Sequence, residues 1–375
     1  IKGVPGSGCY GHNGADDVAA DAALLAMAVP GKHVHLQWSR EDEHAWEPYG
    51  SAMVMELEAL IQPDGKITHW KYALWSDTHG ARPGGDAANL LTAHYLENPI
   101  NKKPSGFSGG AYRNADPYYA IPNRLVTANF FDGPLRTSSL RSLGAYANIF
   151  AIESFIDELA IHAGKDPFEF RIQNLEDDRA TAVLRQLQKQ LAASPATHAV
   201  PTLATHTDPT SATPASPTPT THSIGTGIAF SRYKNSGSWC AVAARVSVDK
   251  TTGIVSVNKM WAVIDAGEVI NLDGIKNQIE GGMIQSASWT LHEQVKFDGK
   301  QVTSRQWATY PVMHINQAPE VEVTVIPRPQ EPPLGAGEAA QGPAAAAIVN
   351  AVYNACGVRV RSLPAGKIVL TSAPK

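Results

Sequence analysis

The stretch Pro332-Pro333-Leu334-Gly335-Ala336-Gly337-Glu338 leads directly into a run of small residues at 339–347. The two prolines stiffen the approach, and the two glycines allow a positive φ or a close approach to a ligand. The alanine-rich run favours a helix, so Glu338 is expected near its N-terminus, where the helix dipole stabilises a carboxylate. From this pattern alone, Glu338 is either a common helix-stabilising carboxylate or, if buried, a general base.

The composition is that of a globular chain with few metal-ligand motifs. Its 375 residues are 43% hydrophobic and 18% charged, which allows two or three domains with buried cores. The net charge of −4, without a long basic run, argues against nucleic acid as a partner. Cys9, Cys240 and Cys356 form no CxxC pair, so we expect no zinc ribbon, iron–sulfur cluster or disulfide framework. No apolar run reaches the ~18 residues of a membrane span, and we assign no metal-ligating residue.

Periodicity and turn signals predict alternating helices and strands. Helices are expected at 18–26, 147–163, 168–174 and 180–191, from about 273, and after Glu338. Strands are expected at 33–38, 52–61, 67–75, 118–131 and within 293–326, and a hairpin from 240–248 and 255–264. Residues 76–117, rich in Gly, Asn and Pro, are expected to form a long functional loop. This order predicts an α+β fold with layered mixed sheets and packed helices, not a repeat array.

The composition changes sharply at residues 192–222, where Ala, Ser, Pro and Thr dominate. Such a segment has almost nothing to bury and is expected to be a disordered linker or a surface insertion. We therefore divide the chain into a first region at 1–191 and a second region at 223–375, which contains Glu338. The chain begins at Ile1, without the charged and apolar regions of a signal peptide, so we expect it to start inside a longer unit.

Five stretches, taken in order, resemble one family. They are the glycine-rich turn from Gly6 to Gly11, Trp38-Ser39-Arg40-Glu41-Asp42, Leu140-Arg141-Ser142-Leu143-Gly144, Gln278-Ile279-Glu280-Gly281-Gly282 and Gly335-Ala336-Gly337-Glu338. The chain resembles the molybdopterin-binding large subunit of the xanthine dehydrogenase and aldehyde oxidoreductase family. Its closest likeness is to the bacterial branch with isoquinoline oxidoreductase, nicotinate dehydrogenase and membrane-bound aldehyde dehydrogenases. The resemblance implies the molybdenum-cofactor-binding domains of the xanthine oxidase family for both regions.

The resemblance also implies roles for individual residues. Glu338 takes the place of the family's general base, and Gln278 that of a pterin contact. Arg141 would lie near the metal through its backbone, and Gly337 belongs to the cofactor-facing loop. Leu143 stands where xanthine-oxidising members have a substrate-stacking Phe, which argues against a purine substrate. The remaining cofactor contacts are the turn residues Gly8, Cys9, Tyr10 and Gly11, where Cys9 and Tyr10 depart from the family's usual Phe and Gly.

The loop around Tyr112 and Arg113 is open to two interpretations, since it either lines the substrate pocket or lies on the surface. We place Tyr112 with Leu143 among the expected pocket residues. Neither offers an acidic or amide pair for a ring nitrogen, which favours an aldehyde as substrate.

The activity implied is oxidation of an aldehyde to a carboxylic acid, with water as the oxygen source. The alternatives are hydroxylation of an N-heteroaromatic such as nicotinate or isoquinoline, and a non-catalytic fragment in which Glu338 only caps a helix. The implied cofactor is molybdenum with molybdopterin cytosine dinucleotide. Electrons would leave through a small [2Fe-2S] subunit and a haem c-containing cytochrome c subunit, and the missing N-terminal part would complete the site. From the branch we expect a complex at the bacterial inner membrane, on the periplasmic side.

Overall fold

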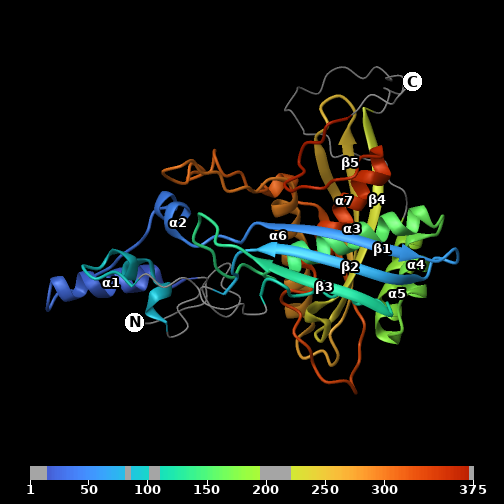
Figure 1. The fold of residues 1–375 in the computed structure, drawn as a ribbon, viewed down its shortest axis with the longest axis horizontal. Helices are drawn as coiled ribbons and strands as arrows, with labels where there is room; N and C mark the ends of the chain where they lie inside the picture. The colour runs from blue at the N-terminus through green and yellow to red at the C-terminus, as the bar shows by residue number, and fades with distance from the viewer. Residues whose placement is uncertain (1–14, 81–85, 101–109, 195–220, 371–375) are drawn as a thin grey trace, which may run out of the picture.

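The computed structural model describes residues 15–80, 86–100, 110–194 and 221–370, and Figure 1 shows their arrangement. A four-stranded mixed sheet has the order β4-β5-β6-β7: β4 (His222–Arg232), β5 (Trp239–Asp249), β6 (Val255–Asp265) and β7 (Glu320–Val325). The first three strands are antiparallel, whereas β7 runs parallel to β6. A second sheet contains β1 (Met53–Ile61) and β2 (Ile67–Ser76), which are antiparallel, and β3 (Asn123–Phe130), parallel to β2. These mixed sheets with packed helices confirm the α+β prediction.

Alternate residues of β5 belong to two different hydrophobic cores, so both faces of its sheet are covered. Cys240, Val242 and Ala244 pack in the core shared with α6 (Leu272–Leu291) and α7 (Gln341–Cys356). Their neighbours Ala241 and Ala243 pack in the core shared with the second sheet. Three further helices follow in order: α3 (Ala145–His162), α4 (Pro167–Gln173) and α5 (Asp178–Ala193).

The helix α7 lies at the centre of the fold and is buried at every residue from its start to Val352. It packs against β4 at Gly225 and Gly227, where an added Cβ would lie 2.2 Å from backbone atoms of Ala351. The small side chains at 339–347 are thus explained by packing, because only small residues let helix and strand backbones approach this closely. Gly342, in the first turn of α7, faces α3, where an added Cβ would lie 2.6 Å from the side chain of Ile149.

Most of the expected elements are present, with two corrections. Residues 33–38 form no strand: their burial alternates as expected, but no neighbouring strand pairs with them. They lead into α2 (Arg40–Trp46), where Ser39 and Asp42 form a capping box. Within 293–326 the structure has β7 and one isolated bridge between Phe297 and Val302. The prediction of several strands there was therefore wrong.

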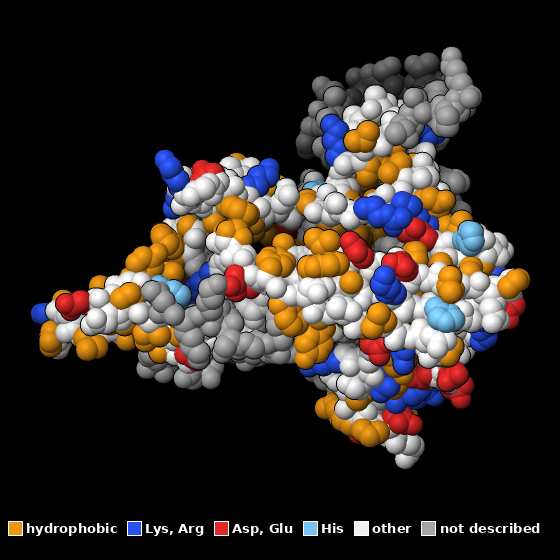
Figure 2. Space-filling model, in the orientation of Figure 1, with side chains coloured by type: hydrophobic (Ala, Val, Ile, Leu, Met, Phe, Trp, Pro, Cys, Tyr) orange, Lys and Arg blue, Asp and Glu red, His pale blue; other side chains and the backbone are white. Residues whose placement is uncertain are grey.

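The boundaries of the 192–222 segment are narrower than expected, because α5 continues to Ala193 and β4 begins at His222. Residues 195–220 lie outside the described residues. The helix expected at 18–26 is α1 (Asp17–Ala28), and Figure 1 shows it with α2 at one end of the molecule, away from the four-stranded sheet. Leu24, Leu25 and Met27 of α1 are exposed, and Figure 2 shows hydrophobic side chains on this end of the surface. Among the described residues, no helix combines the length and apolar character of a membrane span.

Candidate active site

Glu338 lies in the turn before α7, and two segments from other parts of the chain bind its carboxylate. The backbone N–H of Ser142 donates to Oε1 at 2.7 Å, and the hydroxyl of Tyr233 donates to Oε2 at 2.5 Å. The N-cap of α7 is Ala340, without a side-chain cap hydrogen bond, and the helix begins at Gln341. Glu338 therefore lies before the N-cap of α7 and does not cap the helix through its side chain.

The loop that carries Glu338 is fixed along its length. Leu334 N–H donates to the carbonyl of Ala266 at 2.8 Å, just after the end of β6, and the Ser238 hydroxyl donates to the carbonyl of Gly335 at 2.8 Å. The same loop passes close to Gly267, whose φ of +72° and contact with Pro332 require glycine. The ends of two strands thus hold the loop in place, and its carboxylate is pre-positioned.

The turn before α3 is strained in a way that aims a backbone amide at Glu338. Ser142 and Leu143 have φ values of 75° and 53°, which non-glycine residues rarely adopt. Gly144 follows, and a Cβ there would lie 2.3 Å from the carbonyl oxygen of Ala111. Its N–H donates to the carbonyl of Gly110 at 2.9 Å. The loop at 110–114 therefore lies directly against this turn.

Arg141 joins three separated segments through its guanidinium and is almost fully buried. Its Nε donates to the carbonyl oxygen of Gly337 at 2.7 Å, and its Nη2 donates to the backbone and side-chain oxygens of Gln278 at 2.9 and 3.1 Å. The structure thus brings together Arg141, Gln278 and Gly337, three residues that the resemblance placed at the cofactor. A guanidinium suits this arrangement, because its planar fork of N–H donors can reach several acceptors at once.

Tyr233, which directly follows β4, is a site residue that sequence reasoning missed. It is buried, and burial together with the negative charge of Glu338 raises its pKa well above the usual value. Arg113 Nη1 donates to the Tyr233 hydroxyl at 2.6 Å and lies 3.9 Å from Glu338 Oε2. The sequence around Tyr233 contains a strand end and a turn but no motif, so only the fold identifies it.

A buried asparagine on α3 holds the loop that presents Arg113. Asn148 Nδ2 donates to the carbonyls of Ala111 and Arg113, each at 2.9 Å, and its Oδ1 accepts from the Tyr72 hydroxyl at 2.7 Å. The side chain of Arg113 therefore lies beside Tyr233 and Glu338. Tyr112 is 45% exposed and Leu143 is half-buried, both next to residues that form the site. The four expected cofactor contacts in the N-terminal turn, Gly8, Cys9, Tyr10 and Gly11, lie outside the described residues.

The polar groups around Glu338 fit the pterin that the resemblance implies. Gln278 is exposed, and Arg141 fixes its amide by binding the Oε1 atom. Within the described residues its amide nitrogen has no protein partner, so it can donate to a ligand. The hydroxyl of Ser142 is buried and also lacks a partner in the described part of the chain. An added Cβ at Gly335 would meet no atom within 4 Å, which leaves room beside the loop.

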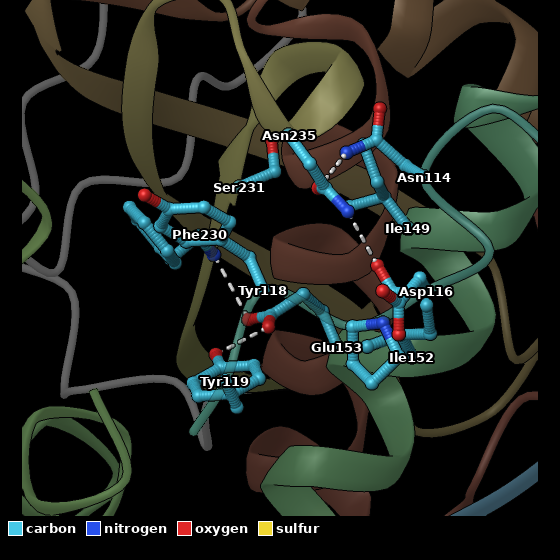
Figure 3. A pocket seen from close by; sticks show the side chains of 11 residues that line it. Asn114, Asp116, Tyr118, Tyr119, Ile149, Ile152, Glu153, Phe230, Ser231 and Asn235 are labelled. Atoms are coloured by element: carbon cyan, nitrogen blue, oxygen red, sulfur yellow. Dashed lines mark hydrogen bonds between the residues drawn. The ribbon is translucent and has the colours of Figure 1, made fainter. Parts of the chain in front are cut away.

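A pocket between α3 and the end of β4 has a structural character. Figure 3 shows Glu153 in it, accepting from the Tyr119 hydroxyl at 2.5 Å and from Phe230 N–H at 2.9 Å. Glu153 also forms a buried ion pair with Arg171 at 2.8 Å. Every oxygen of this carboxylate is therefore occupied, and the network ties α3 to β4. Further residues that line the pocket are Asn114, Asp116, Pro117, Tyr118, Ile149, Ile152, Ser231 and Asn235.

Comparisons with known proteins identify the family of the chain. The molybdopterin cofactor-binding domain matches residues 8–175 and 151–319. A nicotinate dehydrogenase chain of Pseudomonas putida is 37% identical over 96% of this chain and 29% of its own length. The membrane-bound aldehyde dehydrogenase (pyrroloquinoline-quinone) of Gluconacetobacter polyoxogenes is 26% identical over 95% of this chain and 44% of its own length.

The solved aldehyde oxidoreductase from Desulfovibrio desulfuricans has a TM-score of 0.69 at 17% identity, covering 96% of this chain and 52% of that chain. This likeness shows the fold alone. The chain spans less than half the length of the two curated relatives above. By its two matched domains, the chain belongs to the molybdopterin cofactor-binding domains of the xanthine oxidase family.

Proposed function

We propose that this chain supplies the general base and part of the cofactor cradle of a molybdenum hydroxylase. The observation that carries the proposal is the Glu338 carboxylate, held at both oxygens by Ser142 and Tyr233. Bound molybdenum cofactor supplies the two-electron oxidation and the site at which water-derived oxygen is activated. Glu338 would serve as the base that holds the proton released from water in this oxidation.

The other residues of the site position the reactants. Gln278 would donate its amide N–H to the pterin, and Arg141 holds both Gln278 and the Gly337 carbonyl in place. The turn residues Gly8, Cys9, Tyr10 and Gly11 would add backbone amides near the metal, and Tyr112 and Leu143 would line the substrate pocket. A general base of this kind contributes about 10²- to 10⁴-fold to the rate.

For the substrate, we favour an N-heteroaromatic that carries a carboxylate, such as nicotinate. Arg113 is 19% exposed beside Glu338 and uses Nη1 on Tyr233. Within the described residues its Nε and Nη2 have no protein partner, so they are available to an anionic substrate. The 37% identity to a nicotinate dehydrogenase chain supports the same choice.

Oxidation of an aldehyde to a carboxylic acid is the second candidate. It is supported by Leu143, which offers no aromatic ring for stacking, and by the likeness to a membrane-bound aldehyde dehydrogenase. The sequence alone ranked the two substrate classes in the opposite order, because it did not place Arg113 next to Glu338.

We extend the proposal to the assembly that the relatives suggest. The cofactor would be the cytosine dinucleotide form, and the electrons would pass to a small [2Fe-2S] subunit and a cytochrome c subunit. The rest of the large subunit would complete the site, since this chain covers only part of its relatives. Association with the inner membrane, on the periplasmic side, is part of the same proposal, as is the division at residues 192–222.

The test is Glu338→Gln in the intact enzyme that contains this chain, assayed with nicotinate and with acetaldehyde. The expected result is a loss of about 10²- to 10⁴-fold in kcat at unchanged molybdenum content, with CMP released on acid hydrolysis of the cofactor. The matched control is Glu331→Gln. Glu331 lies on the same loop as Glu338, and its half-exposed carboxylate pairs with Arg179 of α5. Wild-type turnover by Glu338→Gln would overturn the assignment, and the better of the two substrates decides the substrate class.

A further inference from the structure

We propose that Tyr233 is a positioning residue for Glu338, and that Arg113 fixes the direction of the Tyr233 hydroxyl. The inference rests on the proposed role of Glu338 as the base. Ser142 and Tyr233 approach the two carboxylate oxygens from different segments, the turn before α3 and the end of β4. A carboxylate held at both oxygens cannot rotate without breaking one of the two hydrogen bonds.

Arg113 determines which way the phenol donates. A tyrosine hydroxyl has one proton to give, whereas a guanidinium N–H can only donate. Since Arg113 Nη1 lies 2.6 Å from the Tyr233 oxygen, that oxygen accepts from Arg113, and its single proton is directed to Glu338 Oε2. The direct distance from Arg113 to Glu338 is 3.9 Å, too long for a hydrogen bond, so Arg113 acts on the carboxylate through Tyr233.

The phenol remains a donor under working conditions. Tyr233 is only 6% exposed. Burial is the largest cause that raises its pKa, and the charge of Glu338 is the second, so the hydroxyl keeps its proton. Arg113 opposes this shift without reversing it. Each carboxylate oxygen accepts about two hydrogen bonds. One hydrogen bond on each therefore leaves room for the proton that the reaction releases.

The backbone around Tyr233 is as firmly held as its side chain. Its N–H donates to the carbonyl of Ser238 at 3.0 Å, and its carbonyl accepts from Gly237 N–H at 2.7 Å. Asn114 contacts the flanking residues on both sides: its Nδ2 donates to the Arg232 carbonyl at 2.8 Å and its Oδ1 accepts from Lys234 N–H at 2.8 Å. The loop that presents Arg113 thus also holds the strand end that presents Tyr233.

The experiment is Tyr233→Phe in the intact holoenzyme, which removes the hydroxyl and keeps the ring. Loss of a hydrogen bond to a charged group predicts about a 10- to 100-fold lower kcat, with KM within about twofold because the substrate keeps its own contacts. Molybdenum content and thermal midpoint should stay at the wild-type values. The matched control is Tyr146→Phe, which should leave kcat unchanged. Tyr146 is a partly buried tyrosine on α3 whose hydroxyl forms a hydrogen bond with Thr290 at 2.9 Å.

A second variant, Arg113→Met, tests the path through Tyr233 without altering the tyrosine. With acetaldehyde, which has no anionic group for Arg113 to bind, it should lower kcat by itself, and the double variant should have the kcat of Tyr233→Phe alone, since Arg113 then acts only through the hydroxyl. Additive losses of kcat in the double variant would contradict the proposal that Arg113 acts on Glu338 through Tyr233. A wild-type kcat for Tyr233→Phe, or a loss of molybdenum with it, would overturn the positioning role. Turnover retained by Glu338→Gln is a different result, because it removes the proposed function itself.

Discussion

Arg141 and Gly337 are joined by two hydrogen bonds from one guanidinium, with Nε 2.7 Å and Nη2 2.5 Å from the same carbonyl oxygen. The Nη2 atom also donates to Gln278, so one side chain sets the spacing between the Glu338 loop and the second turn of α6. These contacts link residues that are 137 and 196 positions apart. Arg141 therefore holds Gly337 and Gln278 in a fixed position relative to each other.

Arg141→Lys should weaken retention of the cofactor. An ammonium group is compact and cannot reproduce the planar fork that binds Gly337 and Gln278 together. By analogy with the residues that support metal ligands, we expect about a 10- to 100-fold loss in cofactor affinity. The measurement is molybdenum per chain after dialysis, with Arg185→Lys as control, since Arg185 forms a half-exposed pair with Glu169. Full molybdenum in both variants would show that Arg141 is not needed for the cradle.

Arg113→Gln should separate the two substrate classes. If Nε and Nη2 bind a substrate carboxylate, KM for nicotinate should rise about 10- to 100-fold, because a hydrogen-bonded charge pair is lost. KM for acetaldehyde, which has no anionic group, should change little. Arg124→Gln is the control, because Arg124 pairs with Asp116 at a more exposed position. A similar change in KM for both substrates would contradict an anion-binding role.

Much of the fold could be predicted because its signals are local. The hairpin of β5 and β6 follows from strand periodicity on either side of a turn, and α3 follows from its apolar spacing and from Gly164 after its end. Residues 33–38 carry the same alternation as a strand yet lack a partner. Strand formation depends on a neighbour, which the periodicity of one segment does not reveal.

The site shows the same limit. Glu338, Arg141 and Gln278 were recognisable because each belongs to a motif of the family. Tyr233 belongs to none, and its role arises only because the end of β4 meets an acceptor 105 positions further along the chain. For the same reason, the sequence left open whether Arg113 lines the pocket or lies on the surface, since its partners lie 120 and 225 positions further along.

His79 should make the folded state less stable in acid. Burial lowers its pKa from 6.5 to about 4, with the charge of Arg113 adding to the effect and that of Asp77 opposing it. Between these values the unfolded state binds more protons, so stability is full above pH 6.5 and falls as the pH drops towards 4. The upper limit of the loss is about 3 kcal/mol. Urea unfolding across this range should show a shallower pH dependence for His79→Gln, but not for a control at exposed His69. An unchanged slope would contradict the prediction.

Gly227→Ala should destabilise the fold strongly, because α7 leaves no room for a side chain on β4. The added Cβ would lie 2.2 Å from Ala351 N and 2.4 Å from the Ala347 carbonyl oxygen. Both are backbone atoms, so the helix itself must move, and we expect a loss of about 3 kcal/mol in the free energy of unfolding. The control is Gly299→Ala, an exposed position with no atom within 4 Å of the added Cβ. The measurement is the urea midpoint of the purified enzyme. Equal urea midpoints for Gly227→Ala and the wild type would mean that α7 does not pack closely against β4. The packing explanation for the alanine run would then be wrong.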